Sequence, residues 1–67
     1  VQYAVRPGKR EGGLSVWSYD QGQLVAVEAV RDPAAYILGK KCLENNMSPA
    51  PSQIIDPAFD LKQFING

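Results

Sequence analysis

Residues 15–30 read SVWSYDQGQLVAVEAV, and this stretch decides the fold. Two runs rich in β-branched and aromatic residues flank a short polar segment, which is typical of a β-hairpin. We therefore predict strands at Leu14–Tyr19 and Gln23–Val30. Both runs carry apolar residues on both faces, whereas a short hairpin normally exposes one of its faces to water. The pattern indicates that something covers each face of this hairpin.

The segment between the two strands sets their pairing. Asp20–Gly22 fits a three-residue hairpin loop in which Gly22 takes the left-handed conformation. The cross-strand pairs predicted from this loop are Trp17/Val25, Ser15/Val27, Val16/Ala26 and Leu14/Glu28. An aromatic–β-branched pair such as Trp17/Val25 stabilises a hairpin by up to about 1 kcal/mol.

A strand and a helix flank the hairpin. Residues 1–6 alternate in a strand pattern, and the Pro-Gly pair at 7–8 ends this strand. Asp32 is a suitable N-cap for a helix that we predict over Pro33–Asn45, with Pro33 at its first position. Its apolar stripe consists of Ala35, Leu38, Gly39 and Cys42, flanked by Tyr36 and Leu43. Because glycine disfavours a helix by about 1 kcal/mol relative to alanine, we expect a close approach to the sheet at Gly39.

The last third of the chain, residues 48–67, is cut into short pieces by three prolines. We predict one turn at Ser52–Ile55 and a short helix at Leu61–Ile65, capped by Asp60. The chain as a whole is predicted to be one α+β domain over residues 1–67: a small antiparallel sheet covered on one face by a helix, with a short C-terminal helix. Nothing else in 67 residues is large enough to cover the second face of the sheet.

The composition argues against catalysis by this chain. With no histidine and one cysteine, it has no imidazole base, no Cys/His zinc site and no disulfide. The glycines in KREGGLS lack the spacing of a nucleotide-binding loop. Cys42 lies on the apolar stripe, where a thiol behaves as a small apolar side chain. We therefore predict no catalytic, cofactor-binding or metal-binding residue.

Most carboxylates have a local explanation as turn or cap residues: Asp20, Asp32, Asp56 and Asp60. Glu28 is different, because it interrupts an apolar strand; it is expected at a sheet edge or paired with Arg6 or Arg31. Seven basic and seven acidic residues give no net charge, which argues against binding to nucleic acid or to an anionic membrane. No run is apolar enough to span a bilayer and no signal peptide is visible, so we expect a cytoplasmic protein.

One face of the predicted hairpin is rich in large apolar residues: Trp17, Tyr19, Val25 and Val27. This face, and Tyr3 on the first strand, have two interpretations, packing within the sheet layer and contact with another domain or partner.

The ordered series of segments resembles the C-terminal domain of FAD- and NADH-dependent ferredoxin reductases of the rhodocoxin reductase and putidaredoxin reductase type. The resemblance rests on VQYAVRPG at 1–8, SVWSYDQGQLVAVEAVRDPAAYILGKK at 15–41 and IIDPAFDLKQFI at 54–65. It covers essentially the whole chain, although these residues form the fold and no single motif among them is specific. The chain begins with Val1 instead of Met, from which we expect a piece of a longer protein.

The resemblance implies that the parent protein passes electrons from NADH through FAD to a ferredoxin. The family's FAD- and NAD-binding domains carry Rossmann-like glycine fingerprints that are absent here. The resemblance therefore implies a domain that binds neither group itself, packs on the FAD-binding domain and helps to dock the ferredoxin. The flavin domain, together with a strand that precedes VQYAVRPG in the family, would cover the second face of the hairpin.

The resemblance also gives the exposed lysines a role, because ferredoxins are acidic. Related reductases have a basic residue near the position of Lys40, so we expect Lys40 and then Lys41 to face the ferredoxin. The alternative is that both lysines are merely solvated. A competing interpretation of the whole chain is a stand-alone module without redox activity that forms a homodimer through its sheet, since uncovered faces and strand edges are adhesive.

Overall fold

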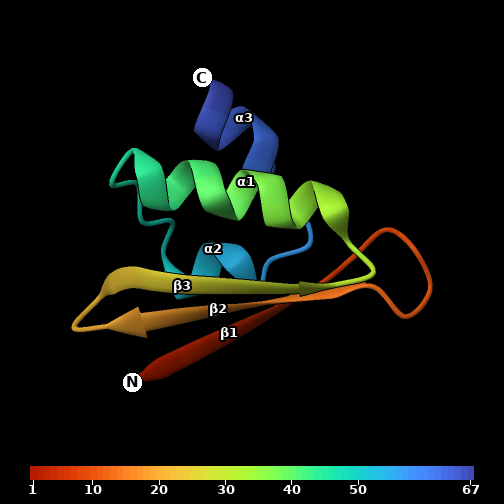
Figure 1. Ribbon diagram of the computed structural model, residues 1–67, viewed down its shortest axis with the longest axis horizontal. Coiled ribbons are helices and arrows are strands. Elements are labelled where there is room, and N and C mark those ends of the chain that lie inside the picture. Colours follow the sequence, from red (N-terminus) through yellow and green to blue (C-terminus); the bar gives the residue numbers. More distant parts are fainter.

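A three-stranded antiparallel sheet with helices on one side makes up the computed structural model, which describes residues 1–67 (Figure 1). The strands are β1 (Gln2–Pro7), β2 (Leu14–Asp20) and β3 (Gln23–Val30), and they lie in the order β1-β2-β3. The helices are α1 (Pro33–Glu44), α2 (Pro51–Ile54) and α3 (Leu61–Asn66). The predicted α+β class is confirmed, and each predicted element ends within one residue of its observed bounds.

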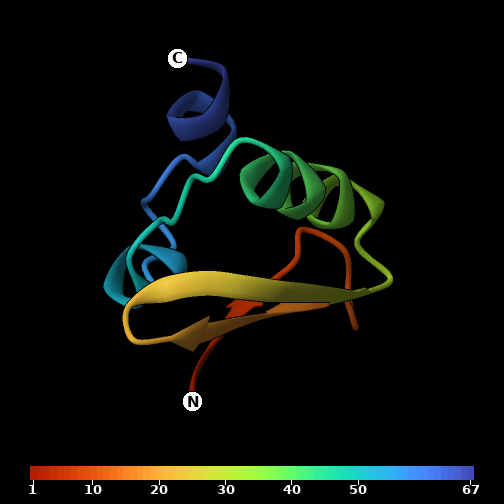
Figure 2. The same ribbon diagram turned by 60° about the vertical axis from the view of Figure 1, so that its left-hand side comes forward.

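All three helices lie on one side of the sheet, which we call the inner face; the opposite side is the outer face. Figure 2 shows α1 lying across the inner face, with α2 next to the sheet and α3 farthest from it. Helix α1 packs on β3, α2 packs on β1, and α3 packs on α1. The helix layer therefore covers one face of the sheet only.

The hydrophobic core fills the space between the inner face and the helices. It consists of Ala4, Trp17, Tyr19, Leu24, Cys42, Ile54 and Leu61. The indole Nε1 of Trp17 donates a hydrogen bond to the hydroxyl of Ser15 at 2.9 Å, and the Tyr19 hydroxyl donates to the Pro49 carbonyl at 2.6 Å. Every buried side-chain nitrogen and oxygen has a hydrogen-bond partner, so the core carries no uncompensated polar group.

Two features fix helix α1: a cap at its first turn and a close approach to the sheet at its middle. The Asp32 carboxylate accepts a hydrogen bond from the backbone N–H of Ala35 at 3.2 Å, which confirms the predicted N-cap. The expected close approach at Gly39 is also confirmed, because a Cβ atom there would lie 2.6 Å from Cγ1 of Val27 on β3. No larger side chain fits between this helix and the sheet without displacing one of them.

The hairpin turn differs from the prediction. Its loop has two residues, Gln21 and Gly22, and both have positive φ, 52° and 81°. Positive φ at both central positions is typical of a type I′ turn, whose twist matches that of the flanking strands. Asp20 is therefore the last residue of β2, paired with Gln23, instead of the first residue of the loop.

A β-bulge then shifts the pairing by one more residue. Tyr19 lies opposite Leu24 but Ser18 lies opposite Ala26, so Val25 has no partner on β2. The observed pairs are Trp17/Val27, Ser15/Ala29, Val16/Glu28 and Leu14/Val30. The four predicted pairs are thus wrong by two residues. Side chains alternate between the two faces with a period of two, so a pairing error of two residues does not move a side chain to the other face. Trp17 and Val27 therefore still lie on the same face.

Candidate interaction surfaces

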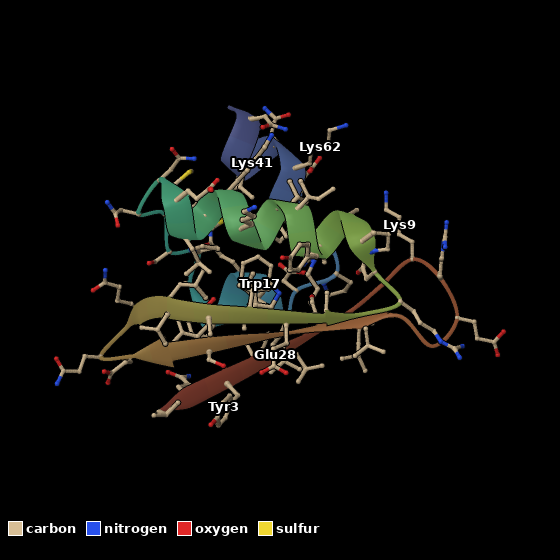
Figure 3. All side chains as sticks on the ribbon, in the orientation of Figure 1. Tyr3, Lys9, Trp17, Glu28, Lys41 and Lys62 are labelled. Carbon is tan, nitrogen blue, oxygen red and sulfur yellow. The ribbon has the colours of Figure 1, made fainter.

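The outer face of the sheet carries an exposed apolar surface. Its cross-strand rows are Tyr3–Ser18–Ala26, Val5–Val16–Glu28 and Pro7–Leu14–Val30. Tyr3, Val5 and Val30 are 65%, 50% and 52% exposed, and no helix lies over them. Figure 3 shows the side chains of Tyr3 and Glu28 pointing away from the helices. A contiguous apolar surface of this kind is characteristic of packing against another protein surface.

Glu28 lies on this outer face, on the edge strand β3. The expected edge position is therefore confirmed. Arg6 does not pair with it, because the Arg6 guanidinium bonds to backbone carbonyls of residues 54–59 on the inner side of the sheet.

The residues predicted to form an interdomain face lie mainly on the other side. Trp17 and Tyr19 are 0% and 1% exposed within the core of this chain, and Val27 packs under Gly39. An interdomain contact is therefore wrong for Trp17 and Tyr19, and the alternative interpretation, packing within the chain, holds. Val25, at the bulge, is 52% exposed. Alternation in a sequence shows that a strand has two faces but does not show which face receives the helix.

Helix α1 exposes both lysines that the sequence singled out. Lys40 and Lys41 do not act as a pair, because consecutive residues on a helix point about 100° apart. Three apolar side chains lie one turn away from Lys40: Tyr36, Ile37 and Leu43, which are 56%, 55% and 38% exposed. The exposed carboxylate of Glu44 is also one turn away. A base set among exposed aromatic and aliphatic side chains is a composition typical of protein–protein contacts. We call these three residues with Lys40 and Lys41 the helix surface.

A second basic group forms only in the folded chain. The largest hollow of the molecule, about 840 Å³, lies between the β1–β2 loop, the first turns of α1 and residues 54–62. Five of the seven basic residues line it: Arg6, Lys9, Arg10, Arg31 and Lys62. They come from segments far apart in the sequence, so only the fold brings them together. Among these five, Arg6 alone donates side-chain hydrogen bonds within the chain.

Lys62 extends the basic character of the helix side. It is exposed on α3, and α3 packs on α1. Figure 3 shows Lys62 and Lys41 on the same side of the molecule, away from the sheet. The helix side therefore presents cations from two helices, whereas the outer sheet face presents apolar residues and Glu28.

The buried phenol of Tyr19 and the buried thiol of Cys42 stay protonated at neutral pH. Burial, and secondarily the Cys42 thiol, raises the pKa of Tyr19 to about 12, and burial also raises the pKa of Cys42. A thiol held in its protonated form is a poor nucleophile. No three side chains of the His, Cys, Asp and Glu types come together as a metal site. None of the helices has the length and apolar composition needed to cross a bilayer.

Comparisons with known proteins show the family to which this chain belongs. The family model described as "Reductase C-terminal" matches residues 1–65. The crystal structure of the ferredoxin reductase for the CYP199A2 system from Rhodopseudomonas palustris is similar, with a TM-score of 0.88 and 32% sequence identity. The match covers 97% of this chain and 16% of that one, so the chain spans a small part of that reductase. No curated protein sequence matches.

Proposed function

Because the chain belongs to the reductase C-terminal family, we propose that it is the C-terminal domain of an FAD-dependent ferredoxin reductase that passes electrons from NADH to a ferredoxin. The observation that carries this proposal is the structural match to a ferredoxin reductase over nearly the whole chain. In this proposal the domain performs no redox step itself. It packs on the flavin domain of the parent and helps to dock the ferredoxin.

The chain's own residues do not fit an FAD or NADH site. Rossmann-type sites need a glycine-rich turn between a parallel strand and a helix, whereas all pairings here are antiparallel. We therefore assign no flavin or nucleotide contact to this chain, and both groups would bind elsewhere in the parent protein.

The outer sheet face is the proposed packing surface toward the flavin domain. Its exposed valines and Tyr3 have no cover within the chain, and burying apolar area contributes about 25 cal/mol per Å². Trp17 and Tyr19 have no part in this contact, because they lie in the core. In this proposal Tyr3, Val5 and Val30 make the contact instead.

The helix surface is the proposed docking site for the ferredoxin. Lys40 lies in its apolar centre, and Lys41 and Lys62 lie on the same side of the molecule. Apolar residues contribute most of the affinity of such a contact, and the surrounding charges favour the correct partner and speed its approach. The helix surface itself consists of apolar residues and two lysines, and ferredoxins are acidic, so these lysines would attract the partner.

The visible absorption spectrum of the complete protein that contains this chain tests the redox part of the proposal. We expect flavin bands that bleach when NADH is added, because NADH reduces bound FAD. A colourless protein that NADH does not change would contradict the proposal and favour the second candidate, a stand-alone module that dimerises through the outer sheet face.

A charge reversal tests the docking part. In the complete reductase, Lys40→Glu should raise the KM for ferredoxin about two- to fivefold, the effect of losing one exposed charge contact, with a further rise from repulsion. Turnover with NADH and ferricyanide, a small acceptor that needs no docking surface, serves as the internal control and should not change. Equal ferredoxin kinetics in the variant and the parent enzyme would remove Lys40 from the docking site.

A further inference from the structure

Arg6 differs from the other six basic residues in how its charge is used. Its side chain is half-buried on the inner side of β1. The guanidinium Nη1 donates to the carbonyls of Ile54 and Asp56 at 3.1 and 3.0 Å, and Nη2 donates to the carbonyl of Phe59 at 2.5 Å. A single side chain thus binds three carbonyls of the segment that joins α2 to α3.

The same guanidinium also reaches the aromatic side chains next to α3. Its Cζ atom lies 5.8 Å from the centre of the Phe59 ring, within the range of a cation–π contact. The Phe59 ring lies 5.6 Å from the ring of Phe64, tilted by 58°, and Phe64 belongs to α3. Arg6 is therefore connected to α3 both through the backbone and through the contact between the Phe59 and Phe64 rings.

Helix α3 needs such support, because six residues are too few for a stable helix in water. Asp60, directly after Phe59, caps it by accepting a hydrogen bond from the N–H of Gln63 at 3.0 Å. The position of the cap depends on the backbone before it, which Arg6 holds. Arg6 thus holds the backbone that leads into the cap of α3.

We infer that Arg6 is a positioning residue for ferredoxin docking: by holding residues 54–59 it places α3, and with it Lys62, beside the helix surface. This inference rests on the proposed function. Arg6 does not touch the ferredoxin in this arrangement, because both terminal nitrogens of its guanidinium already donate to carbonyls within the chain. The role requires arginine, because its planar guanidinium group can donate to several carbonyls at once. A lysine ammonium is a compact charge on a flexible side chain and cannot hold the same geometry.

A double-mutant cycle tests this inference in the complete protein, with an acidic [2Fe–2S] ferredoxin as the probe and Kd measured by isothermal titration calorimetry. Lys62→Gln should raise Kd about two- to fivefold. Arg6→Lys, which keeps the charge, should raise Kd by a similar factor because Lys62 is then misplaced. The double variant should be no weaker than the weaker single variant, since both changes remove one interaction. Arg10→Lys, an exposed arginine without side-chain hydrogen bonds, is the matched control and should leave Kd unchanged.

A merely structural role for Arg6 would give different results. It would produce additive effects in the double variant, or an unchanged Kd for Arg6→Lys while Lys62→Gln weakens binding; either outcome overturns the inference. If neither Lys62→Gln nor Lys40→Glu changes Kd, the docking proposal itself fails. The amide shifts of residues 61–66 in the Arg6→Lys protein then decide whether Arg6 positions α3, and unchanged shifts would refute it.

A second variant covers the case in which Arg6→Lys does not fold. Phe59→Leu removes the ring between the guanidinium and Phe64 and leaves Arg6 in place. It should raise Kd, and its effect should be non-additive with that of Lys62→Gln. Additive effects would count against the connection from Arg6 to α3.

Discussion

Tyr19 shows, at the scale of one residue, how the sheet is tied to the last third of the chain. Its ring lies in the core with 1% exposure, and its hydroxyl donates to the carbonyl of Pro49, thirty residues away. Burying a phenol is favourable only if the hydroxyl finds an acceptor, and the Pro49 carbonyl provides it. The burial that makes this contact also disfavours the phenolate, which explains the raised pKa of Tyr19, about 12.

This pKa predicts a loss of stability in alkali. An unfolded tyrosine loses its proton near pH 10, whereas folded Tyr19 keeps it to about pH 12. Above pH 10 the unfolded state therefore binds fewer protons than the folded state, and the free energy of unfolding falls as the pH rises toward 12. The raised pKa of Cys42 acts in the same direction.

Urea unfolding at pH 8, 10 and 11 measures this effect. Tyr19→Phe should be less stable at pH 8 by about 1 kcal/mol, because it loses a hydrogen bond. Its stability should then decline less steeply above pH 10 than that of the unchanged protein. Parallel declines in the two proteins would show that Tyr19 does not cause the loss.

At the scale of elements, the contact between α1 and β3 shows how a weak local preference is overridden. Glycine is unfavourable within a helix, yet Gly39 lies at the point where α1 meets Val27. The absence of a side chain lets the helix backbone approach the strand, and the closer packing of Cys42 and the core offsets the local cost. Helix α1 could be located from the sequence because its cap, its proline and its apolar stripe all agree.

The pairing of the hairpin could not be predicted in the same way. Gln21 has positive φ, a conformation that asparagine or glycine adopts more readily. A glutamine at this position is therefore a weak signal for a two-residue turn. The bulge that leaves Val25 unpaired has no sequence signal at all. It lets Tyr19 and Leu24 lie opposite each other, and both are buried. Tertiary packing thus decides the register, which local patterns cannot specify.

On the scale of the whole molecule, the two sides of the sheet have different character. The helix side carries the core and the bases, and the outer side carries exposed valines and Tyr3. The sequence indicated that one face lacks a cover within the chain, and it pointed to Lys40 and Lys41. It named Tyr3 but not Val5 and Val30 as residues that could contact a partner, because the identity of the outer face depends on which side the helices occupy. It did not single out Lys62, and it considered Arg6 only as a partner of Glu28, because the contacts of both residues join segments that are distant in the sequence.

The uncovered face predicts self-association when the chain is present without the rest of a reductase. We expect dimers or larger species at high concentration in size-exclusion chromatography with light scattering. Val5→Lys, at an exposed position of the outer face, should shift the population toward monomer without a large loss of stability.

Ile37→Lys is the matched control for this experiment, because Ile37 is similarly exposed, 55% against 50% for Val5, but lies on α1. It should leave the association unchanged. A monomer at every concentration, or an equal response to both substitutions, would show that the outer face does not cause association.

The hydrogen bonds of Arg6 also bear on the order in which the chain folds. The two residues joined by each bond are separated in the sequence by 48, 50 or 53 positions. The strand pairings, in contrast, connect neighbouring segments. Closing a long loop costs more entropy than closing a hairpin, so the sheet and α1 are expected to form before the Arg6 contacts. Interactions that form after the transition state slow unfolding and leave the folding rate unchanged. The Arg6 contacts would then slow the detachment of the last third of the chain from the sheet without changing the rate at which the sheet forms.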